Sequence, residues 1–294
     1  MDFKKIVIII PYRGIGDIIF HLPLLRGLYK KYRSRLIVIT NSTNKAKILL
    51  KNEICINKIY YINFTRENQI KNSYFFLKRL NDFNSDLSVL TAPTKRLIIP
   101  LLISNSKKKI FYKKSNIQDL AKYIFYQSQN IFSEINFDRN YQLKVKNNLI
   151  FNNVLFVNID SHHDQNNWGE ENFINLIKKI LKKNKIKKIY INFAPSKINN
   201  FKKIFDKFNN ENKIFFTYKE KFEEIISYIN QSKIIIGNES GPMCIGAALN
   251  KKVISIYHPE HTNKSSLIIN KKVNFINTKQ ISAKKIISKI LKFL

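Results

Sequence analysis

Residues 234–257 read IIIGNESGPMCIGAALNKKVISIY, and this stretch decides the fold that we predict for the chain. Three consecutive isoleucines are typical of a strand buried on both faces of a parallel sheet, and Gly237 with Asn238 is expected to end that strand. Ser240 follows where a helix N-cap belongs, and Pro242 suits the first helical position. A short helix rich in small residues and a second apolar run then complete a strand, helix, strand unit.

The start of this short helix is a candidate anion site, because its unpaired N–H groups and the positive end of its dipole favour a phosphate. The Ser240 hydroxyl and the N–H groups of Gly241, Met243 and Cys244 are the expected donors, since Pro242 has no N–H. A turn whose glycines serve only the backbone is the alternative, and the short motif alone does not decide between the two.

The rest of the chain alternates between strand-like and helix-like runs. This alternation predicts right-handed crossovers and parallel sheets. Strands are expected at residues 4–11, 35–40, 58–62, 87–90, 109–112, 154–159, 188–193 and 213–216. Helices are expected at residues 45–51, 68–80, 94–103, 117–126, 173–181, 198–208, 222–229 and 282–294. Residues 132–153 are polar and lack a clear period, so we place a domain boundary there.

Composition narrows the class of protein without identifying it. The 294 residues suit two domains of ordinary size, and 44% hydrophobic with 13% aromatic residues argues against disorder. A net charge of +32 favours an anionic partner, although lysines spread along exposed helix faces also fit a codon bias. Two cysteines far apart fit a reducing compartment, and neither a leader nor a bilayer-spanning run is visible, so we expect a cytoplasmic protein, at most peripheral to a membrane.

A second glycine-bearing loop follows the first expected strand, and Asp17 opens the next helix there. An aspartate in this place is commonly a helix N-cap, and its carboxylate is also a candidate general base. Pro23, six residues later, is expected to kink that helix or to restart it.

Together these stretches resemble glycosyltransferase family 9, the lipopolysaccharide heptosyltransferase-like enzymes. Gly16, Asp17, Leu22 and Pro23 match that family's motif G-D-x-x-x-x-L-P, and residues 238–253 resemble its D-S/T-G-P-M-H-x-A-A-A-L-G-x-P-V. Trp168 matches the tryptophan of its K-x-W-P loop. The departures from the family that bear on the donor site are Glu239 in place of Asp, Cys244 in place of His and Asn166 in place of Lys.

The resemblance implies an α/β fold of the GT-B type, with two Rossmann-like domains whose parallel sheets face a central cleft. Residues 1–150 would bind the acceptor and residues 151–294 the nucleotide-sugar, and the last helix would be able to cross back. The implied activity is inverting transfer of a sugar to a hydroxyl of a bacterial surface glycan (lipopolysaccharide core, O-antigen or capsule), without a metal or other cofactor. Asp17 would be the base, and the implied donor-binding residues are Gly16, Ser161, His162, Asn166, Trp168, Glu239, Ser240, Gly241, Pro242, Met243 and Cys244.

Other functions stay open at this point. A non-catalytic protein of the same fold that binds a nucleotide-sugar or a polyanion would explain the positive charge, and a sugar-nucleotide epimerase would share the fold. No nucleic-acid-binding signature is present, so we expect none as a partner; we expect a lipid-linked or lipopolysaccharide glycan acceptor and peripheral contact with an anionic membrane. Residues 162–164 read His-His-Asp, yet adjacent histidines rarely converge on one metal ion, so no metal site is expected. His258 and His261 fit a solvated loop and a ligand contact equally well.

Overall fold

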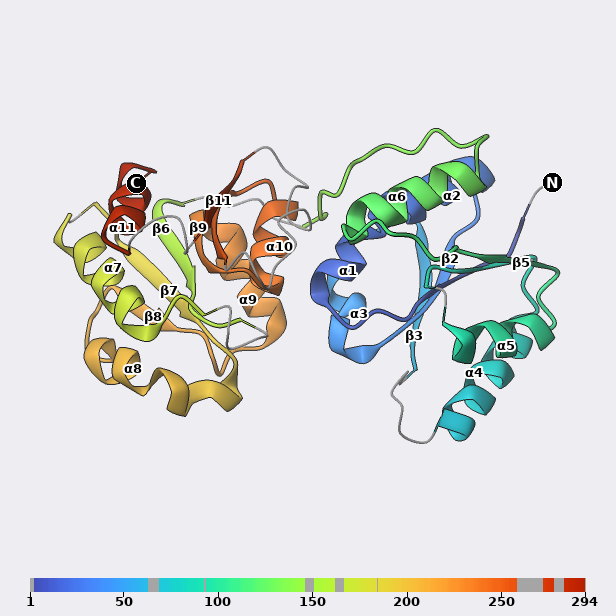
Figure 1. Cartoon of the computed structure of the whole chain (residues 1–294), viewed down its shortest axis with the longest axis horizontal. Coiled ribbons are helices and arrows are strands. Elements are labelled where there is room, and N and C mark those ends of the chain that lie inside the picture. Colours follow the sequence, from blue (N-terminus) through green and yellow to red (C-terminus); the bar gives the residue numbers. More distant parts are fainter. Residues whose placement is uncertain are drawn as a thin grey trace. The chain divides into compact units, whose positions relative to one another are not determined.

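The computed structural model describes residues 3–62, 69–92, 94–145, 151–161, 167–183, 185–257, 272–277 and 283–293. The chain divides into two compact units, Met1–Lys144 and Val145–Leu294, and each unit has its own parallel sheet with helices on both faces (Figure 1). This is the α/β architecture that the alternation predicts. Among the described helices, none combines the length and the hydropathy that a bilayer span requires.

The sheet of unit 1 has the order β3-β2-β1-β4-β5, and all of its strand pairs are parallel. Its strands are β1 (Ile6–Ile10), β2 (Leu36–Thr40), β3 (Ile56–Tyr61), β4 (Leu87–Leu90) and β5 (Lys108–Phe111). Its helices are α1 (Ile15–Phe20), α2 (Leu22–Tyr32), α3 (Ala46–Leu49), α4 (Gln69–Phe83), α5 (Lys95–Ile103) and α6 (Leu120–Ile131), with a 3-10 turn η1 (Ser42–Asn44).

Strand β1 is the buried centre of unit 1, as its five apolar residues predict. Val7 and Ile9 point to the face where Phe76 and Leu80 of α4 pack with α5. Helices α2 and α6 lie on the opposite face (Figure 1). Because both faces of β1 are covered by helices, the strand reads as a continuous apolar run rather than an alternating one.

The sheet of unit 2 has the order β11-β10-β9-β6-β7-β8 and is parallel throughout. Its strands are β6 (Phe151–Asn158), β7 (Lys188–Asn192), β8 (Ile214–Phe216), β9 (Ser232–Asn238), β10 (Lys252–Tyr257) and β11 (Val273–Asn277). Its helices are α7 (Glu170–Lys182), α8 (Lys202–Phe208), α9 (Phe222–Gln231), α10 (Gly241–Ala248) and α11 (Ala283–Phe293), and a 3-10 segment η3 (Pro195–Phe201) precedes α8.

Helices α7, α8 and α11 cover one face of this sheet, where Val157, Ile191, Ile236 and Ile256 form the core with them. On the other face α10 packs so closely that a Cβ at Gly246 would lie 2.9 Å from Cγ1 of Ile235. The small residues of the opening stretch therefore bring α10 onto the sheet. Within each unit, the strand order reverses between two adjacent strands, β1 and β4 in unit 1 and β6 and β9 in unit 2. Ligands of open α/β sheets bind at such points, beyond the carboxyl ends of the strands.

Three local predictions need correction or gain detail. Strand β9 does not end before Gly237 but runs through Asn238, because Gly237 pairs with Asn158 of β6 in the parallel register. The predicted helix after Asp17 ends at Phe20 and restarts at Leu22, with Pro23 in its first turn. Strand β11 was not predicted, because its five residues VNFIN form neither a continuous apolar run nor a regular alternation.

Candidate active site

Asp17 lies at the switch point of unit 1, in the loop and helix that follow β1. Gly14 is the N-cap of α1, and Asp17 is the third helical residue rather than the cap itself. Its Oδ2 accepts a hydrogen bond of 2.7 Å from the Gly14 N–H. Gly16 is buried inside the same short helix. One oxygen thus anchors the carboxylate at the carboxyl edge of the sheet. In this position the carboxylate can stabilise the helix start and can also accept a proton.

The electrostatic surroundings of Asp17 favour a base. Burial raises the pKa of its carboxyl from an ordinary value of 3.8 to about 6, and the hydrogen bond from Gly14 opposes that rise. At pH 7 a group with this pKa is ionised in about nine molecules of ten and is still close enough to neutrality to hold a proton transiently. A carboxylate with such a pKa is better suited to general-base catalysis than an exposed aspartate.

His21 occupies the junction between α1 and α2 and is fully buried. Its Nδ1 lies 2.6 Å from the Asp17 carbonyl oxygen, and its Nε2 lies 2.9 Å from Oγ1 of Thr91. A carbonyl only accepts, so Nδ1 carries the proton and Nε2 is an acceptor toward the Thr91 hydroxyl, whose single proton is shared with the Ile9 carbonyl oxygen at 3.1 Å. Burial lowers the pKa of His21 to about 4, which keeps the ring neutral. Both ring nitrogens are used in holding the Asp17 helix to β4, and His21 is therefore a positioning residue.

The loop that carries Asp17 is fixed by polar residues beyond the ends of the neighbouring strands. The Tyr12 hydroxyl donates to the Thr91 carbonyl oxygen at 3.2 Å, the Thr43 hydroxyl to the Arg13 carbonyl oxygen at 2.9 Å, and Asn44 Nδ2 to the Tyr12 carbonyl oxygen at 3.0 Å. Sequence reasoning did not single out these residues. Their positions in the sequence could have indicated them. Thr91 and Asn44 closely follow predicted strands, and side chains after parallel strands meet at one edge of the sheet.

A row of side-chain hydrogen bonds runs along the carboxyl edge of unit 2. The Thr217 hydroxyl donates to Asn192 Oδ1 at 2.9 Å, Asn192 Nδ2 to Asn158 Oδ1 at 2.7 Å, and Asn158 Nδ2 to Ser240 Oγ at 2.9 Å. We call these four residues the asparagine row; it starts beyond β8, crosses β7 and β6, and ends at the N-cap of α10. Ser240 is therefore positioned by the switch point and not by its own helix, since its side chain makes no capping bond.

Close contact between β6 and β9 makes this row possible. Gly237 has φ +156°, and a Cβ there would lie 2.0 Å from the Asn158 carbonyl oxygen. Only glycine fits this position, because both the conformation and the space exclude a side chain. The glycine thus serves the approach of two strands at the switch point, which brings Asn158 under Ser240.

The first turn of α10 offers fewer groups to an anion than the sequence suggested. The N–H groups of Met243 and Cys244 donate to the Ser240 carbonyl oxygen at 3.1 Å and 3.3 Å, and both side chains are buried. Ser240, Gly241 and Pro242 are half-buried at the helix start. The N–H of the preceding residue, Glu239, donates to the carbonyl oxygen of Ile256 near the end of β10. The Gly241 N–H is the group of this turn that best fits an anion. The Ser240 hydroxyl donates to the Asn238 carbonyl oxygen at 3.1 Å and would have to turn from it to meet an anion.

Trp168 is 7% exposed, and its indole packs at right angles to Phe173 with the ring centroids 5.0 Å apart. Its backbone N–H donates to Asn238 Oδ1 at 3.0 Å, and Asn238 Nδ2 donates to the Ile159 carbonyl oxygen at 2.7 Å. The tryptophan therefore anchors its loop to the end of β9 from inside the core. A direct contact of the indole with a ligand does not fit this burial.

Ser161 is buried beside an ion pair between Lys197 Nζ and Asp160 Oδ1 at 2.9 Å. Lys197 Nζ also donates to the Ser161 carbonyl oxygen at 2.8 Å. Lys197 thus brings a cation to this edge of the sheet and offsets the charge of Asp160. His162 and Asn166 lie outside the described residues, as do His163, Asp164, His258 and His261. In the part of the chain that the structure describes, no three His, Cys, Asp or Glu side chains gather as metal ligands would.

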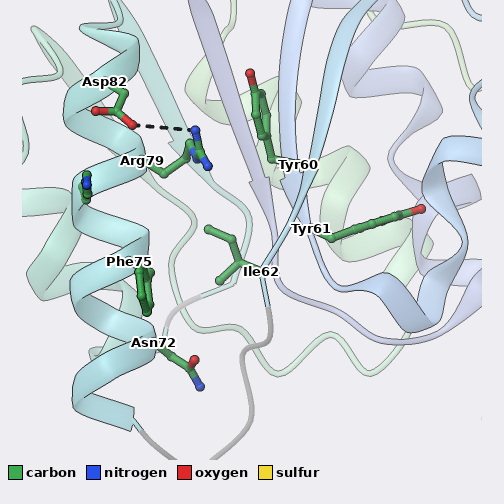
Figure 2. A pocket seen from close by; sticks show the side chains of 8 residues that line it. Tyr60, Tyr61, Ile62, Asn72, Phe75, Arg79 and Asp82 are labelled. Carbon is green, nitrogen blue, oxygen red and sulfur yellow. Dashed lines mark ion pairs between the residues drawn. The ribbon is translucent and has the colours of Figure 1, made fainter.

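A pocket of about 390 Å³ opens in unit 1 between the end of β3 and helix α4 (Figure 2). Tyr60 and Tyr61 line it from β3, and Phe75, Lys78 and Arg79 line it from α4. The Arg79 guanidinium lies over the Tyr60 ring, 5.0 Å from its centroid. The pocket was not predicted, because it depends on how α4 packs beside an edge strand.

This pocket shares a sheet edge with Asp17. Ile10, Thr40 and Tyr61 are consecutive partners in the parallel register, so they form one row across β1, β2 and β3. Two strand spacings separate the end of β1 from the end of β3, which is about 10 Å. Aromatic rings beside cations suit a sugar ring that carries an anionic group.

Comparisons with known proteins agree with this geometry. Residues 112–293 match the model of glycosyltransferase family 9 (heptosyltransferase), which is more than half of the chain. No curated protein matches the sequence significantly. The structure is similar to a family 9 glycosyl transferase from Veillonella parvula DSM 2008, with a TM-score of 0.79, 14% identity and coverage of 99% of this chain and 90% of that one.

Two Escherichia coli enzymes are similar in the same way. ADP-heptose lipopolysaccharide heptosyltransferase II gives a TM-score of 0.73 at 13% identity, covering 98% of each chain. The heptosyltransferase WaaC, solved with ADP, gives 0.71 at 15% identity, covering 99% of this chain and all of that one. At these identities the likeness shows the fold, which is that of the GT-B glycosyltransferases.

Proposed function

Because the chain belongs to glycosyltransferase family 9, the heptosyltransferase family, we propose that it transfers a sugar from a nucleotide-sugar to a hydroxyl of a bacterial surface glycan with inversion at the anomeric carbon. The observation that carries the mechanism is the Asp17 carboxylate, which is anchored at the switch point of unit 1 and has a pKa raised to about 6. Inversion requires one base, which takes the proton of the acceptor hydroxyl while the nucleoside diphosphate leaves from the opposite face.

In this proposal the nucleoside diphosphate binds at the N-terminus of α10. The Ser240 hydroxyl, which the asparagine row holds, and the Gly241 N–H would meet its phosphates together with the positive end of the helix dipole. The Lys197 to Asp160 ion pair supports this assignment, because it compensates the negative charge of Asp160 at this edge of the sheet. Groups fixed before the reaction stabilise a departing charge without reorganisation.

The β3 to α4 pocket of unit 1 is the part that we assign to an acceptor. Its aromatic rings and Lys78 suit a glycan bearing phosphate or carboxylate, and it lies at the sheet edge that carries Asp17. Asp82 also lines the pocket and pairs with Arg79 at 3.7 Å, which leaves Lys78 as its main cation. We infer that such an acceptor is a lipid-linked or lipopolysaccharide glycan. A cytoplasmic site of reaction agrees with only two cysteines in 294 residues.

The test is release of nucleoside diphosphate from a panel of sugar nucleotides in the presence of acidic glycan acceptors, followed by determination of the anomeric configuration of the product. We expect release that depends on both substrates and an inverted product. ADP-heptose is not expected to be the best donor, because Glu239, Cys244 and Asn166 differ together from the family's residues, and such sites discriminate by hydrogen-bond geometry. Binding of a nucleotide-sugar without any turnover would favour the non-catalytic alternative, and an epimerised sugar nucleotide formed without net release of nucleoside diphosphate would favour an epimerase.

A further inference from the structure

Among the residues that the structure describes, helices α4 and α5 carry most of the exposed large apolar side chains. In the described residues ten such side chains are exposed, and six of them lie on these two helices. Their exposed fractions run from 51% to 89%, and they are Ile70, Tyr74, Phe75, Ile99, Leu102 and Ile103. We call this set the α4–α5 face.

The helices that carry the α4–α5 face pack side by side (Figure 1), and Phe75 lies at the border of the face, since it also lines the β3 to α4 pocket. Ile99, Leu102 and Ile103 follow the spacing i, i+3, i+4 and so form one outward stripe on α5. Opposite residues of the same helices, such as Leu80 and Leu101, are fully buried in the core of unit 1. Core packing therefore does not account for the outward apolar residues, and exposed apolar patches of this kind mark sites of interaction.

Cations border and interrupt this face. Lys71 and Lys78 are exposed on α4 among its apolar residues, and Lys95 is exposed one turn before Ile99 on α5. The two acidic residues of this region are already paired, Asp82 with Arg79 at 3.7 Å and Asp86 with Lys107 at 2.8 Å. Surfaces that lie in a membrane interface show this pattern: exposed apolar residues alternate with lysines, and the acidic residues nearby are neutralised by ion pairs.

We propose that the α4–α5 face docks on an anionic lipid surface. Its apolar side chains enter the boundary between headgroups and acyl chains, while the lysines reach back to the headgroups. A second copy of this chain does not fit, because symmetric pairing would bring lysines against lysines. The inference rests on the proposed function in one respect. The β3 to α4 pocket shares Phe75 and Lys78 with this surface, so docking would hold the pocket beside a lipid-linked acceptor.

The experiment is sedimentation of the full chain with vesicles of phosphatidylcholine plus phosphatidylglycerol, and with phosphatidylcholine alone. The face variant is Leu102→Gln with Ile103→Gln, which removes exposed apolar groups and leaves the core intact. Its matched control is Ile54→Gln with Tyr126→Gln, two similarly exposed residues of unit 1 outside the face. The charge variant is Lys71→Gln with Lys95→Gln, and its control is Lys178→Gln with Lys179→Gln on α7, which changes the net charge equally.

We expect the wild type to bind anionic vesicles, the face variant to bind at least about tenfold more weakly, and its control to bind as the wild type does. Each lysine of the charge variant should contribute up to about fivefold at low salt, and this part should vanish as salt rises from about 0.1 M to about 0.5 M. In a second readout, a tryptophan introduced as Ile103→Trp should shift its emission to the blue on anionic vesicles, and one introduced as Tyr126→Trp should not.

Equal losses in the face variant and its control, or equal binding to neutral vesicles, would overturn the proposal. So would a wild type that binds neither vesicle, in which case the face serves a protein partner. The transferase function is measured separately on a detergent-dispersed acceptor, so a failure of docking leaves the proposed reaction unaffected.

Discussion

Replacing Asp17 with asparagine separates the two roles that its geometry allows. The amide oxygen of asparagine accepts the Gly14 N–H as well as a carboxylate oxygen does, but the amide takes up no proton. If Asp17 is the general base, turnover should fall by at least ~10²-fold, the lower end of what general-base catalysis contributes. If capping is its whole role, turnover should be unchanged.

The stability of the Asp17→Asn variant follows from the raised pKa. Because the folded-state pKa of about 6 lies above the ordinary 3.8, the folded protein binds the Asp17 proton more tightly than the unfolded chain does. The resulting cost is absent well below pH 4, grows as the pH rises between 3.8 and 6, and is complete above pH 6 at about 3 kcal/mol. The amide carries no charge at any of these pH values, so the variant should be at least as stable as the wild type at pH 7 and should lose this dependence.

The assay measures kcat/KM for nucleoside diphosphate release between pH 5 and pH 8, together with thermal unfolding at the same values. In the wild type the rate should rise with pH through about 6, as the carboxylate forms, and the variant should lack this limb. Asp119→Asn is the matched control, because Asp119 likewise accepts one backbone N–H at a helix start, that of Lys122 at 3.2 Å on α6. A variant at position 17 with near-normal turnover and the same pH profile would refute the base assignment.

Three further predictions concern unit 2. Ser240→Glu should abolish binding of a nucleoside diphosphate in calorimetry, because it adds a negative charge at the proposed phosphate position; unchanged affinity would refute that position. Asn158→Ala should lower the free energy of unfolding by about 1–3 kcal/mol in denaturant titration and should weaken binding of the diphosphate, because it leaves polar atoms of Asn192 and Ser240 without their partner. No effect on either quantity would show that the asparagine row is incidental. Gly237→Ala should prevent folding or cost more than about 4 kcal/mol, whereas Gly246→Ala, whose Cβ would meet a side-chain carbon at 2.9 Å, should cost less; the reverse order in thermal unfolding would contradict the close approach of β6 and β9.

Local patterns were sufficient for much of the fold. The apolar runs at β1 and β2 predict buried parallel strands because helices cover both faces, and the Pro23 restart follows from the missing N–H of proline. The N-cap at Ser240 and the tight packing of Gly246 were likewise readable from residue type and spacing. Each of these features is indicated by residue types that lie close together in the sequence.

Features that depend on tertiary packing rather than on a local sequence pattern escaped prediction. Gly237 looked like a strand breaker because glycine usually is one, yet its partner Asn158 lies far away in the chain and requires it inside the strand. Trp168 looked like a ligand contact because its motif places it in a loop, but its indole finds Phe173 in the core. The β3 to α4 pocket depends on the packing of a helix beside an edge strand, which no sequence period encodes.

The asparagine row shows that residues typical of turns can also indicate a site once the order of the strands is known. Asn158, Asn192 and Thr217 each stand near or just after the end of a predicted strand, where an isolated polar residue reads as the start of a turn. In a parallel sheet those ends meet at one edge, so three unremarkable turn residues become neighbours as soon as the strand order is β9-β6-β7-β8. The row ends at Ser240 because the order reverses between β6 and β9, which leaves room above Asn158 for the start of α10. The same reversal between β1 and β4 brings His21 and Thr91 together under Asp17. In both units the candidate chemistry therefore follows from strand order, and the motifs around Asp17 and Ser240 mark where that order reverses.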